Sequence, residues 1–299
     1  MSVTASNDTL APEPVRRARL PVARGAAREL LRLPSAIVSL AILLALAVCA
    51  IAPSLVAPYE PYQQDLAQRF LAPSTEHLFG TDDFGRDIFS RVIFGTRISL
   101  LTAVAVVGAS VIVGCVVGTV AAYRGRWTDE VLMRTCDVFM AFPSILLPMI
   151  IVVVLGPSLI NTAIALSVRG WAPFARLMRG QVLAIKDLAY VDAARVLGAN
   201  DRRIVRRYIW PNAIAPILVL AAIDVGFVIL TAAGLGFLGL GAQPPTPEWG
   251  VMVAAGLQNL LIAWWYPVFS GLAIATAVLA FSLLGDALQD WLDPKKSNR

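Results

Sequence analysis

The chain has 299 residues and a formal net charge of +5, and it is 58% hydrophobic but only 15% charged. Soluble domains are roughly 45–50% apolar and about 25% charged. Apolar runs near 20 residues recur, each long enough to cross a ~30 Å hydrocarbon core as a helix. This composition excludes an ordinary soluble domain and predicts an all-α integral membrane protein. The positive charge is therefore no evidence for a nucleic-acid partner, and we expect none.

Residues 1–33 form a polar tail that carries six arginines: Arg16, Arg17, Arg19, Arg24, Arg28 and Arg32. The apolar run that follows, 35–57, is longer than the 7–15 residues typical of the apolar part of a signal peptide. We therefore expect an uncleaved first span behind a cytoplasmic tail.

A transmembrane domain is expected over residues 34–294, followed by a short tail at 295–299. Its apolar runs predict six transmembrane helices, at 35–57, 98–122, 131–154, 158–179, 212–238 and 266–287. The spacing of the runs leaves two longer polar connections outside the membrane, 58–97 and 239–265, and one basic segment, 186–211.

The distribution of lysine and arginine predicts the orientation, because cytoplasmic loops are enriched in these residues. Residues 241–265 carry none, whereas 58–97 holds four arginines against six acidic residues. The N-terminal tail, 123–134, 176–207 and the C-terminal tail are the basic parts of the chain. Both termini and the 186–211 segment are thus expected in the cytoplasm, with 58–97 and 239–265 outside.

Two nucleotide-binding motifs are absent or out of context. Gly234–Gly239 matches GxGxxG, but it ends an apolar span instead of joining a strand to a helix, so we reject a dinucleotide site. A phosphate-binding P-loop requires Gly-Lys before Ser or Thr, and none of the three lysines follows a glycine. We therefore expect no catalysis by this chain, and any ATP hydrolysis must occur on another one.

The 58–97 connection contains a group of charged residues that includes Asp82, Arg86 and Asp87, together with the only histidine, His77. Carboxylates bind hard cations such as Ca²⁺, but the spacing fits no known metal loop and an arginine lies among the acids. A folded, hydrogen-bonded loop without a metal is the better interpretation. The three cysteines, Cys49, Cys115 and Cys136, also lack metal-ligand spacing.

The 186–211 segment has the pattern of two short amphipathic helices joined at Gly198. Asp187 is a candidate cap for the first helix, and Asn200 or Asp201 for the second, which we expect over 202–208 before an interruption at Pro211. Such a helix pair suits a groove on a partner protein or the surface of anionic lipid. Small residues, including Ala193 and Ala194, favour the partner protein.

The residues of this segment also resemble a known family. Asp192-Ala193-Ala194, three residues, Gly198, nine residues and then Tyr208-Ile209-Trp210-Pro211 resembles the EAA loop of bacterial ABC importer permeases. In that family the pattern is Glu-Ala-Ala, x3, Gly, x9, Ile-x-Leu-Pro. Asp192, Tyr208 and Trp210 thus replace Glu, Ile and Leu.

Two further strings narrow the resemblance. The stretch from His77 to Arg97 is similar to the first outer loop of the dipeptide/oligopeptide/nickel permeases, and so is Gly236–Gly250 in the second outer loop. With Ala141-Phe142-Pro143-Ser144 and the final Gly285-Asp286…Asp293-Pro294, the similarity covers about 35–294 and indicates a C-type permease subunit.

The resemblance implies an ABC type I importer permease fold and a multi-pass location in the bacterial cytoplasmic (inner) membrane. It implies four kinds of partner: a homologous B-type permease subunit, two ABC ATPase subunits that hold ATP and Mg, an extracytoplasmic binding protein and a peptide substrate. The chain itself would bind no cofactor. The residues implied in ATPase coupling are Asp192, Ala193, Ala194, Gly198, Tyr208 and Pro211. An ion-coupled secondary transporter, or a permease of the same family for nickel or glutathione, remains an alternative.

Charged residues inside the spans are functional candidates, because burying a charge in the bilayer is costly. A rise of about 1.5 Å per residue places Arg169 and Asp224 near mid-membrane, within roughly 5 Å of each other. They are expected either to form a pair or to line the path and meet the termini of a peptide. Asp137 is expected to be a structural charge near the interface. Glu248 and Trp249 belong to an outer gate, to a dock for the binding protein, or to an ordinary turn.

Overall fold

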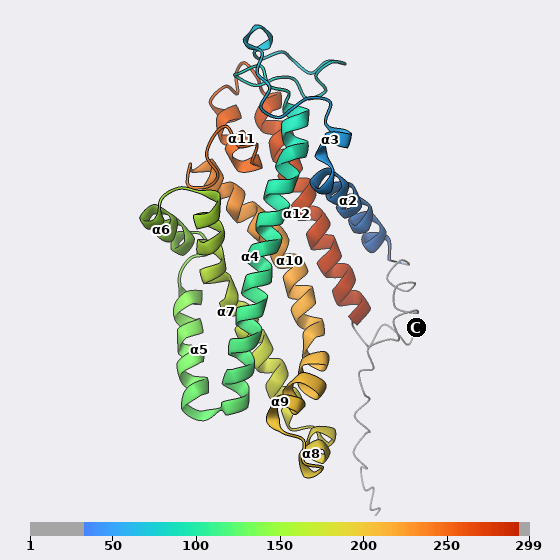
Figure 1. The fold of residues 1–299 in the computed structure, drawn as a ribbon, viewed down its shortest axis with the longest axis vertical. Coiled ribbons are helices and arrows are strands. Elements are labelled where there is room, and N and C mark those ends of the chain that lie inside the picture. Colours follow the sequence, from blue (N-terminus) through green and yellow to red (C-terminus); the bar gives the residue numbers. More distant parts are fainter. Residues whose placement is uncertain (1–32, 293–299) are drawn as a thin grey trace, which may run out of the picture.

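The computed structural model describes residues 33–292, which form helices and loops but no β-strand. Figure 1 shows α4, α7 and α10 along the long axis of the molecule, with α5 and α6 on one side and α2 and α12 on the other. The all-α prediction is confirmed. The helices of this bundle are α2 (Pro34–Ile51), α3 (Pro53–Val56), α4 (Ile88–Arg124), α5 (Arg126–Ala141), α6 (Leu146–Leu155), α7 (Leu159–Lys186), α10 (Trp210–Phe237), α11 (Trp249–Leu257) and α12 (Trp265–Leu292).

The basic residues of the two tails and the Asp293-Pro294 pair lie outside the described residues.

The two ends of the molecule are easily told apart. One, which we call the loop end, carries the connections 57–87 and 238–264. The other, the α8 end, carries the short helices α8 (Ala189–Val196) and α9 (Asp201–Ile204).

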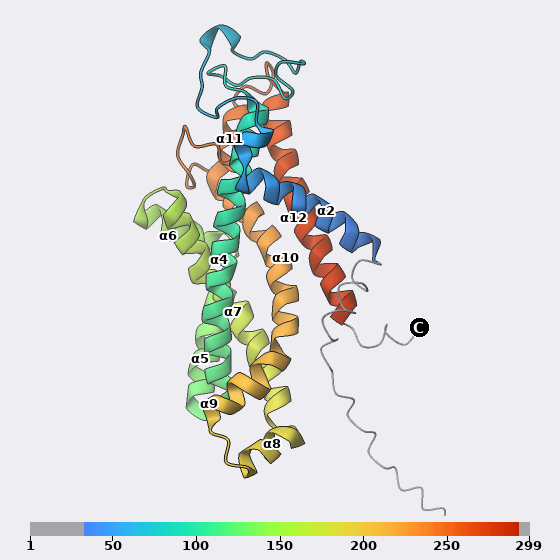
Figure 2. The ribbon, with the colours of Figure 1, turned by 45° about the vertical axis from the view of Figure 1, so that its right-hand side comes forward.

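Helices α4 and α7 form the most extensive helix pair of the bundle. Glycines on α4 allow this close approach: a Cβ on Gly118 would lie 2.3 Å from the carbonyl oxygen of Ala175, and one on Gly114 would lie 2.5 Å from Cβ of Phe174. Small residues at four-residue spacing let two helix backbones meet in a membrane, where dispersion contacts replace the hydrophobic effect between helices. Next in extent are the contacts of α10 with α12 and of α12 with α2, which crosses α12 obliquely (Figure 2).

Two helices are longer than the apolar runs that predict them. Helix α4 has 37 residues and begins at Ile88, ten residues before the expected span. Its start is capped by Asp87, whose side chain accepts a hydrogen bond from the backbone N–H of Ser90 at 2.7 Å. Helix α7 continues past residue 179 to Lys186. Hydropathy marks only the part of a helix that faces lipid, so the polar extensions are missed.

The structure divides the expected third span, 131–154, into α5 and α6, which meet at an angle of 88°. The break falls at Phe142-Pro143, where Phe142 has an extended backbone with φ −76° and ψ 137°. Proline disfavours the helical conformation in the residue before it and has no N–H to continue the ladder.

The expected number of six spans is not reproduced helix for helix. Within residues 33–292, four helical stretches are long and apolar enough to cross a membrane, and the bent pair α5–α6 makes five if it is one span. Helix α7 has 28 residues but carries Arg169, Arg176 and Arg179, which lower its hydropathy. The four stretches are Pro34–Ile51, Ile88–Arg124, Asp201–Phe237 and Trp265–Leu292.

The second connection, 238–264, contains a helix that the sequence did not predict. Helix α11 packs on α10 and α12. Two glycines allow the contact, because a Cβ on Gly250 would lie 2.2 Å from the carbonyl oxygen of Ala233, and one on Gly256 would lie 2.6 Å from Pro267. The connection is therefore part of the folded bundle.

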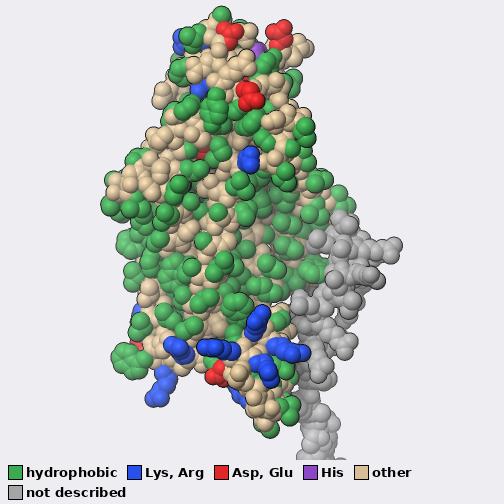
Figure 3. Space-filling view, in the orientation of Figure 1, with side chains coloured by type: hydrophobic (Ala, Val, Ile, Leu, Met, Phe, Trp, Pro, Cys, Tyr) green, Lys and Arg blue, Asp and Glu red, His purple; other side chains and the backbone are tan. Residues whose placement is uncertain are grey.

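Charge is distributed unevenly along the long axis. Figure 3 shows a broad apolar belt, a band of Lys and Arg side chains between this belt and the α8 end, and acidic side chains at the loop end. An apolar belt bordered by charged bands is the surface expected of a protein that spans a bilayer.

Candidate functional site

The 186–211 segment folds at the α8 end as two helical pieces with a bend between them. Helix α8 ends at Val196, and Gly198 has φ +82°, a conformation that glycine adopts without steric cost. Asn200 caps α9 by accepting a hydrogen bond from the N–H of Arg203 at 2.9 Å. The predicted bend and the Asn200 cap are confirmed. The expected cap at Asp187 is wrong, because α8 begins after Leu188 and has no side-chain cap.

The second helix also differs from the prediction. A π-helical turn at Val205–Ile209 follows α9 and runs directly into α10, so the chain is helical without interruption from Asp201 to Phe237. Pro211 lies in the first turn of α10 and does not interrupt the helix. Proline clashes with the carbonyl four residues earlier in an α-helix, and the wider π turn makes room for its ring.

Helix α8 presents two different faces. Val191 and Ala194 are buried, with 0% and 6% exposure, and hold the helix against the bundle. Val196 and Leu197 on the outward side are 89% and 87% exposed. Neither residue was among the candidate coupling residues of the sequence analysis, although their signal was present as an apolar pair between Ala194 and Gly198.

Two of the implied coupling residues are also at the surface of α8. Asp192 and Ala193 are exposed, and Asp192 forms an ion pair with Arg195 at 2.7 Å. Burial acts to lower the pKa of Arg195, but hydrogen bonds to Tyr123 and Asp192 outweigh it and raise the pKa, so Arg195 stays charged. Tyr208 lies behind this surface, with its ring centroid 6.4 Å from that of Tyr190.

Helix α4 holds both ends of the segment. The hydroxyl of Tyr123 donates to Asp201 at 2.7 Å, and Nζ of Lys186 donates to the carbonyl oxygen of Ala122 at 3.2 Å. Farther along α4, Thr119 accepts a hydrogen bond from the indole N–H of Trp210 at 3.0 Å. These three bonds join the end of α7, the start of α9 and the start of α10 to α4 on either side of α8.

Helices α5 and α7 are joined by two ion pairs. Arg179 binds both carboxylate oxygens of Asp129, one of them at 2.6 Å, and Arg176 binds Asp137. A bidentate guanidinium–carboxylate pair fixes the relative orientation of the two groups. The interpretation of Asp137 as a structural charge agrees with this pair.

Arg169 on α7 and Asp224 on α10 are both half-buried. Arg169 is near enough to act electrostatically on Asp224, but across the described part of the chain no ion pair or hydrogen bond joins the two side chains. The expected direct pair is therefore not formed. Their role in the path stays a prediction.

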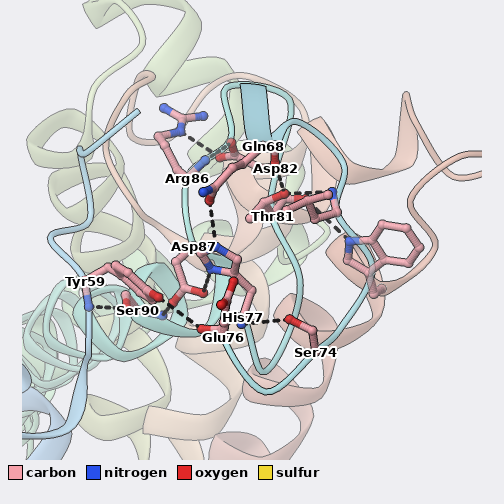
Figure 4. A network of polar contacts seen from close by, with 12 residues as sticks. Tyr59, Gln68, Ser74, Glu76, His77, Thr81, Asp82, Arg86, Asp87 and Ser90 are labelled. Carbon is pink, nitrogen blue, oxygen red and sulfur yellow. Dashed lines mark hydrogen bonds and ion pairs between the residues drawn. The ribbon is translucent and has the colours of Figure 1, made fainter. Parts of the chain in front are cut away.

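The 57–87 connection is folded by a buried polar network (Figure 4). Asp82 is 0% exposed and accepts hydrogen bonds from the N–H of Phe84 at 2.8 Å and from Nε of Arg86 at 2.7 Å. His77 lies between Asp87 and Gln68, with both contacts at 2.9 Å. The prediction of a folded, hydrogen-bonded loop is confirmed. In residues 33–292, no group of three or more His, Cys, Asp or Glu side chains is placed to hold a metal ion.

Glu248 and Trp249 hold the second connection in place. Glu248 is 5% exposed and caps α11 by accepting the N–H of Val251 at 3.0 Å, and this burial raises the pKa of Glu248. Trp249 is 0% exposed and donates its indole N–H to the carbonyl oxygen of Val92 at 3.0 Å. Both side chains serve the structure of the chain. A part in a gate or a dock stays a prediction.

Comparison with known protein families gives two matches. The family described as "Binding-protein-dependent transport system inner membrane component" matches residues 110–298. The family described as "N-terminal TM domain of oligopeptide transport permease C" matches residues 23–73.

Curated relatives match most of the chain. A dipeptide transport system permease protein of Alkalihalophilus pseudofirmus is 43% identical over 91% of this chain and 90% of that protein. A glutathione transport system permease protein of Pectobacterium atrosepticum is 46% identical over 75% of this chain and 74% of that protein. A probable D,D-dipeptide transport system permease protein of Escherichia coli is 41% identical over 81% of this chain and 82% of that protein.

Among solved structures, a chain of the MetNI methionine ABC transporter in inward-facing conformations matches with a TM-score of 0.55. The match covers 69% of this chain and 98% of that chain at 20% identity, and so it shows the fold. The family match over residues 110–298, the relatives above 40% identity and the helical bundle lead to one conclusion. The chain belongs to the binding-protein-dependent transport system inner membrane components, the permease subunits of ABC importers.

Proposed function

We propose that this chain forms, with a homologous B-type permease subunit, the membrane path of an importer for short peptides. Two separate ABC ATPase subunits that bind ATP and Mg drive the path, and an extracytoplasmic binding protein delivers the substrate. The relatives named for dipeptides, D,D-dipeptides and glutathione support this substrate class, because all three carry peptide-like chemistry. Both termini and α8 lie in the cytoplasm.

The observation that carries the proposal is the exposed apolar tip of α8. Val196 and Leu197 face solvent at the end of a segment whose other face is buried. A short helix with apolar side chains on its outward face suits a groove on a partner, and we assign that groove to an ATPase subunit. Ala193 allows close approach of the partner, Asp192 orients Arg195, and Gly198 turns the chain behind the tip.

Coupling through this tip needs a rigid connection to the path. The hydrogen bonds of Tyr123, Lys186 and Trp210 provide it, because they join the segment to α4, which runs the length of the molecule. Tyr208 and Pro211 lie in the turn that leads into α10. ATP-driven movement of the ATPase subunits would thus alter the arrangement of α4, α7 and α10. The ATP site and the membrane path would then be linked by a coupling free energy.

The test replaces Leu197 in the complete transporter. Leu197→Asp places a charge in the proposed contact, and because the side chain is exposed it should change the stability of the chain by no more than about 0.5 kcal/mol. We expect peptide uptake and peptide-dependent ATP hydrolysis to fall by at least about tenfold, as for a central interface residue. Gly198→Pro and Asp192→Arg should have the same effect on an inserted subunit.

Trp127→Ala is the matched control, because Trp127 on α5 is 80% exposed and lies near the α4–α5 turn. It should leave uptake and ATP hydrolysis unchanged. Full transport in the Leu197→Asp, Gly198→Pro and Asp192→Arg variants would contradict the coupling role. Uptake that continues without ATP but stops when an ion gradient is dissipated would show an ion-coupled secondary transporter instead.

The half-buried charges of Arg169 and Asp224 are proposed to line the path. A peptide carries an ammonium group and a carboxylate, so two opposite side-chain charges without a direct bond to each other can each meet one terminus. Arg169→Ala and Asp224→Ala should each lower the uptake of a free dipeptide. Uptake equal to wild type in both variants, at equal amounts of inserted protein, would rule out this role.

A further inference from the structure

A hollow of about 370 Å³ lies where the 186–211 segment meets α10, and it is lined by Arg203, Arg206, Arg207 and Pro211. The three arginines have the spacing i, i+3 and i+4, which places them on one face of the helical stretch. We call this hollow the arginine pocket.

The charges of the arginine pocket have no acidic partner. Within the described residues, none of its three arginines takes part in an ion pair or a side-chain hydrogen bond with a carboxylate, and all three are exposed. By contrast, Arg176, Arg179 and Arg195 of the same end are each paired. Like charges on one helix face destabilise the helix, so the pocket is most stable with an anion in it.

The position of the pocket indicates what kind of anion it meets. Arg207 is followed closely by Trp210, which is 38% exposed at the start of the apolar helix α10. Lys and Arg side chains at this end form a band along the edge of the apolar belt (Figure 3). Arginine and tryptophan at the end of a spanning helix mark the depth of lipid headgroups.

We propose that the arginine pocket binds the phosphate of an anionic phospholipid of the adjoining leaflet. Guanidinium groups bind phosphate oxygens in bidentate pairs, and three of them converge here. The bound lipid neutralises the positive charge of Arg206 and Arg207 on the π-helical turn Val205–Ile209, which is part of the link between α8 and α10. An ATPase surface is the less suitable occupant, because α8, whose end carries the exposed Val196 and Leu197, lies beyond α9 and the start of α10 at the end of the molecule (Figure 1).

The experiment measures lipid binding to the complete transporter, independently of transport. The complex is reconstituted in vesicles of phosphatidylcholine with or without phosphatidylglycerol, and retained phosphatidylglycerol is quantified by native mass spectrometry after extraction. The triple variant Arg203→Gln, Arg206→Gln, Arg207→Gln should bind phosphatidylglycerol on the order of 100-fold more weakly, from the contribution of each basic residue near a charged bilayer. The single variant Arg207→Gln, which is less prone to misfold, should bind phosphatidylglycerol about fivefold more weakly.

The matched control removes three other exposed arginines at the same end, with Arg124→Gln, Arg126→Gln and Arg134→Gln. It should retain wild-type lipid binding. An equal loss in both triple variants would overturn the proposal in favour of nonspecific attraction. Two other results would also overturn it: occupation of the site by inorganic phosphate in pure phosphatidylcholine as tightly as by phosphatidylglycerol, or loss of the ATPase subunits from the arginine-pocket variant in both vesicle types.

Discussion

Asp82 shows how one buried carboxylate organises a whole loop. Its side chain is 0% exposed and accepts three hydrogen bonds, from the N–H groups of Phe84 and Arg86 and from the Nε of Arg86. Nε of Arg91 lies 3.5 Å from Oδ2 of Asp82. The guanidinium of Arg91 also donates to the carbonyl oxygens of Pro61 and Pro245, so it joins the two connections of the loop end. One carboxylate thus balances two arginines that are 6% and 2% exposed.

Asp82→Asn should therefore destabilise the loop end strongly. Removing one partner of a buried ion pair leaves the other charge uncompensated, which costs about 3–5 kcal/mol. The measurement is the thermal unfolding of the purified complex, together with protease cleavage within 57–87. Asp83→Asn is the control, because its carboxylate is 3.6 Å from Arg86 and 29% exposed, and it should cost at most about 1 kcal/mol. Equal effects of both substitutions would contradict the role of Asp82.

At the scale of elements, the contact between α4 and α7 decides the shape of the bundle. Gly118 has no room for a side chain against α7, whereas Gly108 on the same helix has no atom within 4 Å of an added Cβ. The same residue type therefore has different roles at two positions of one helix.

Gly118→Leu should force α4 and α7 apart. Overpacking a close contact costs about 1–3 kcal/mol or more, and the altered helix pair would also move the Tyr123 and Lys186 anchors of the 186–211 segment. We expect a lower unfolding temperature and reduced peptide uptake. Gly108→Leu, the matched control, should change neither. The close-packing argument would be contradicted if both variants unfolded at the same temperature.

The π-helical turn before Pro211 is a second feature at the scale of elements. A proline after a polar stretch normally predicts a helix boundary. Here the helix continues, because a π turn at Val205–Ile209 widens the backbone ahead of the ring and Asn212 donates to the carbonyl oxygen of Tyr208 at 2.6 Å. The segment is thereby joined directly to α10.

For the whole molecule, the two ends should face opposite sides of the membrane. Trp127 near the α4–α5 turn of the α8 end and Leu261 at the loop end are 80% and 100% exposed, so a cysteine at either position is accessible without disturbing the bundle. In a background without the three native cysteines, Leu261→Cys should react with a membrane-impermeant maleimide in spheroplasts, and Trp127→Cys only in inverted vesicles. The reverse pattern would contradict the proposed orientation.

The parts of the fold that could be predicted from the sequence are those with a local signal. Hydropathy placed the starts of α2, α10 and α12 within two residues, and the bend at Gly198 followed from the glycine itself. The candidate site was found through its basic composition and the spacing of Ala193, Ala194 and Gly198. Its exposed tip at Val196 and Leu197 was missed, because exposure depends on which face of α8 the bundle covers.

The remaining features depend on contacts between distant residues. The 88° angle between α5 and α6, the packing of α11 and the absence of a direct Arg169–Asp224 pair could not be read from neighbours in the chain. By itself the sequence determined that the protein is an all-α membrane protein and that residues 186–211 carry its most distinctive surface, because composition and periodicity are local properties. Only the tertiary structure decided which charges pair and how that surface is anchored to α4, because side chains far apart in sequence must be brought together before they can bind.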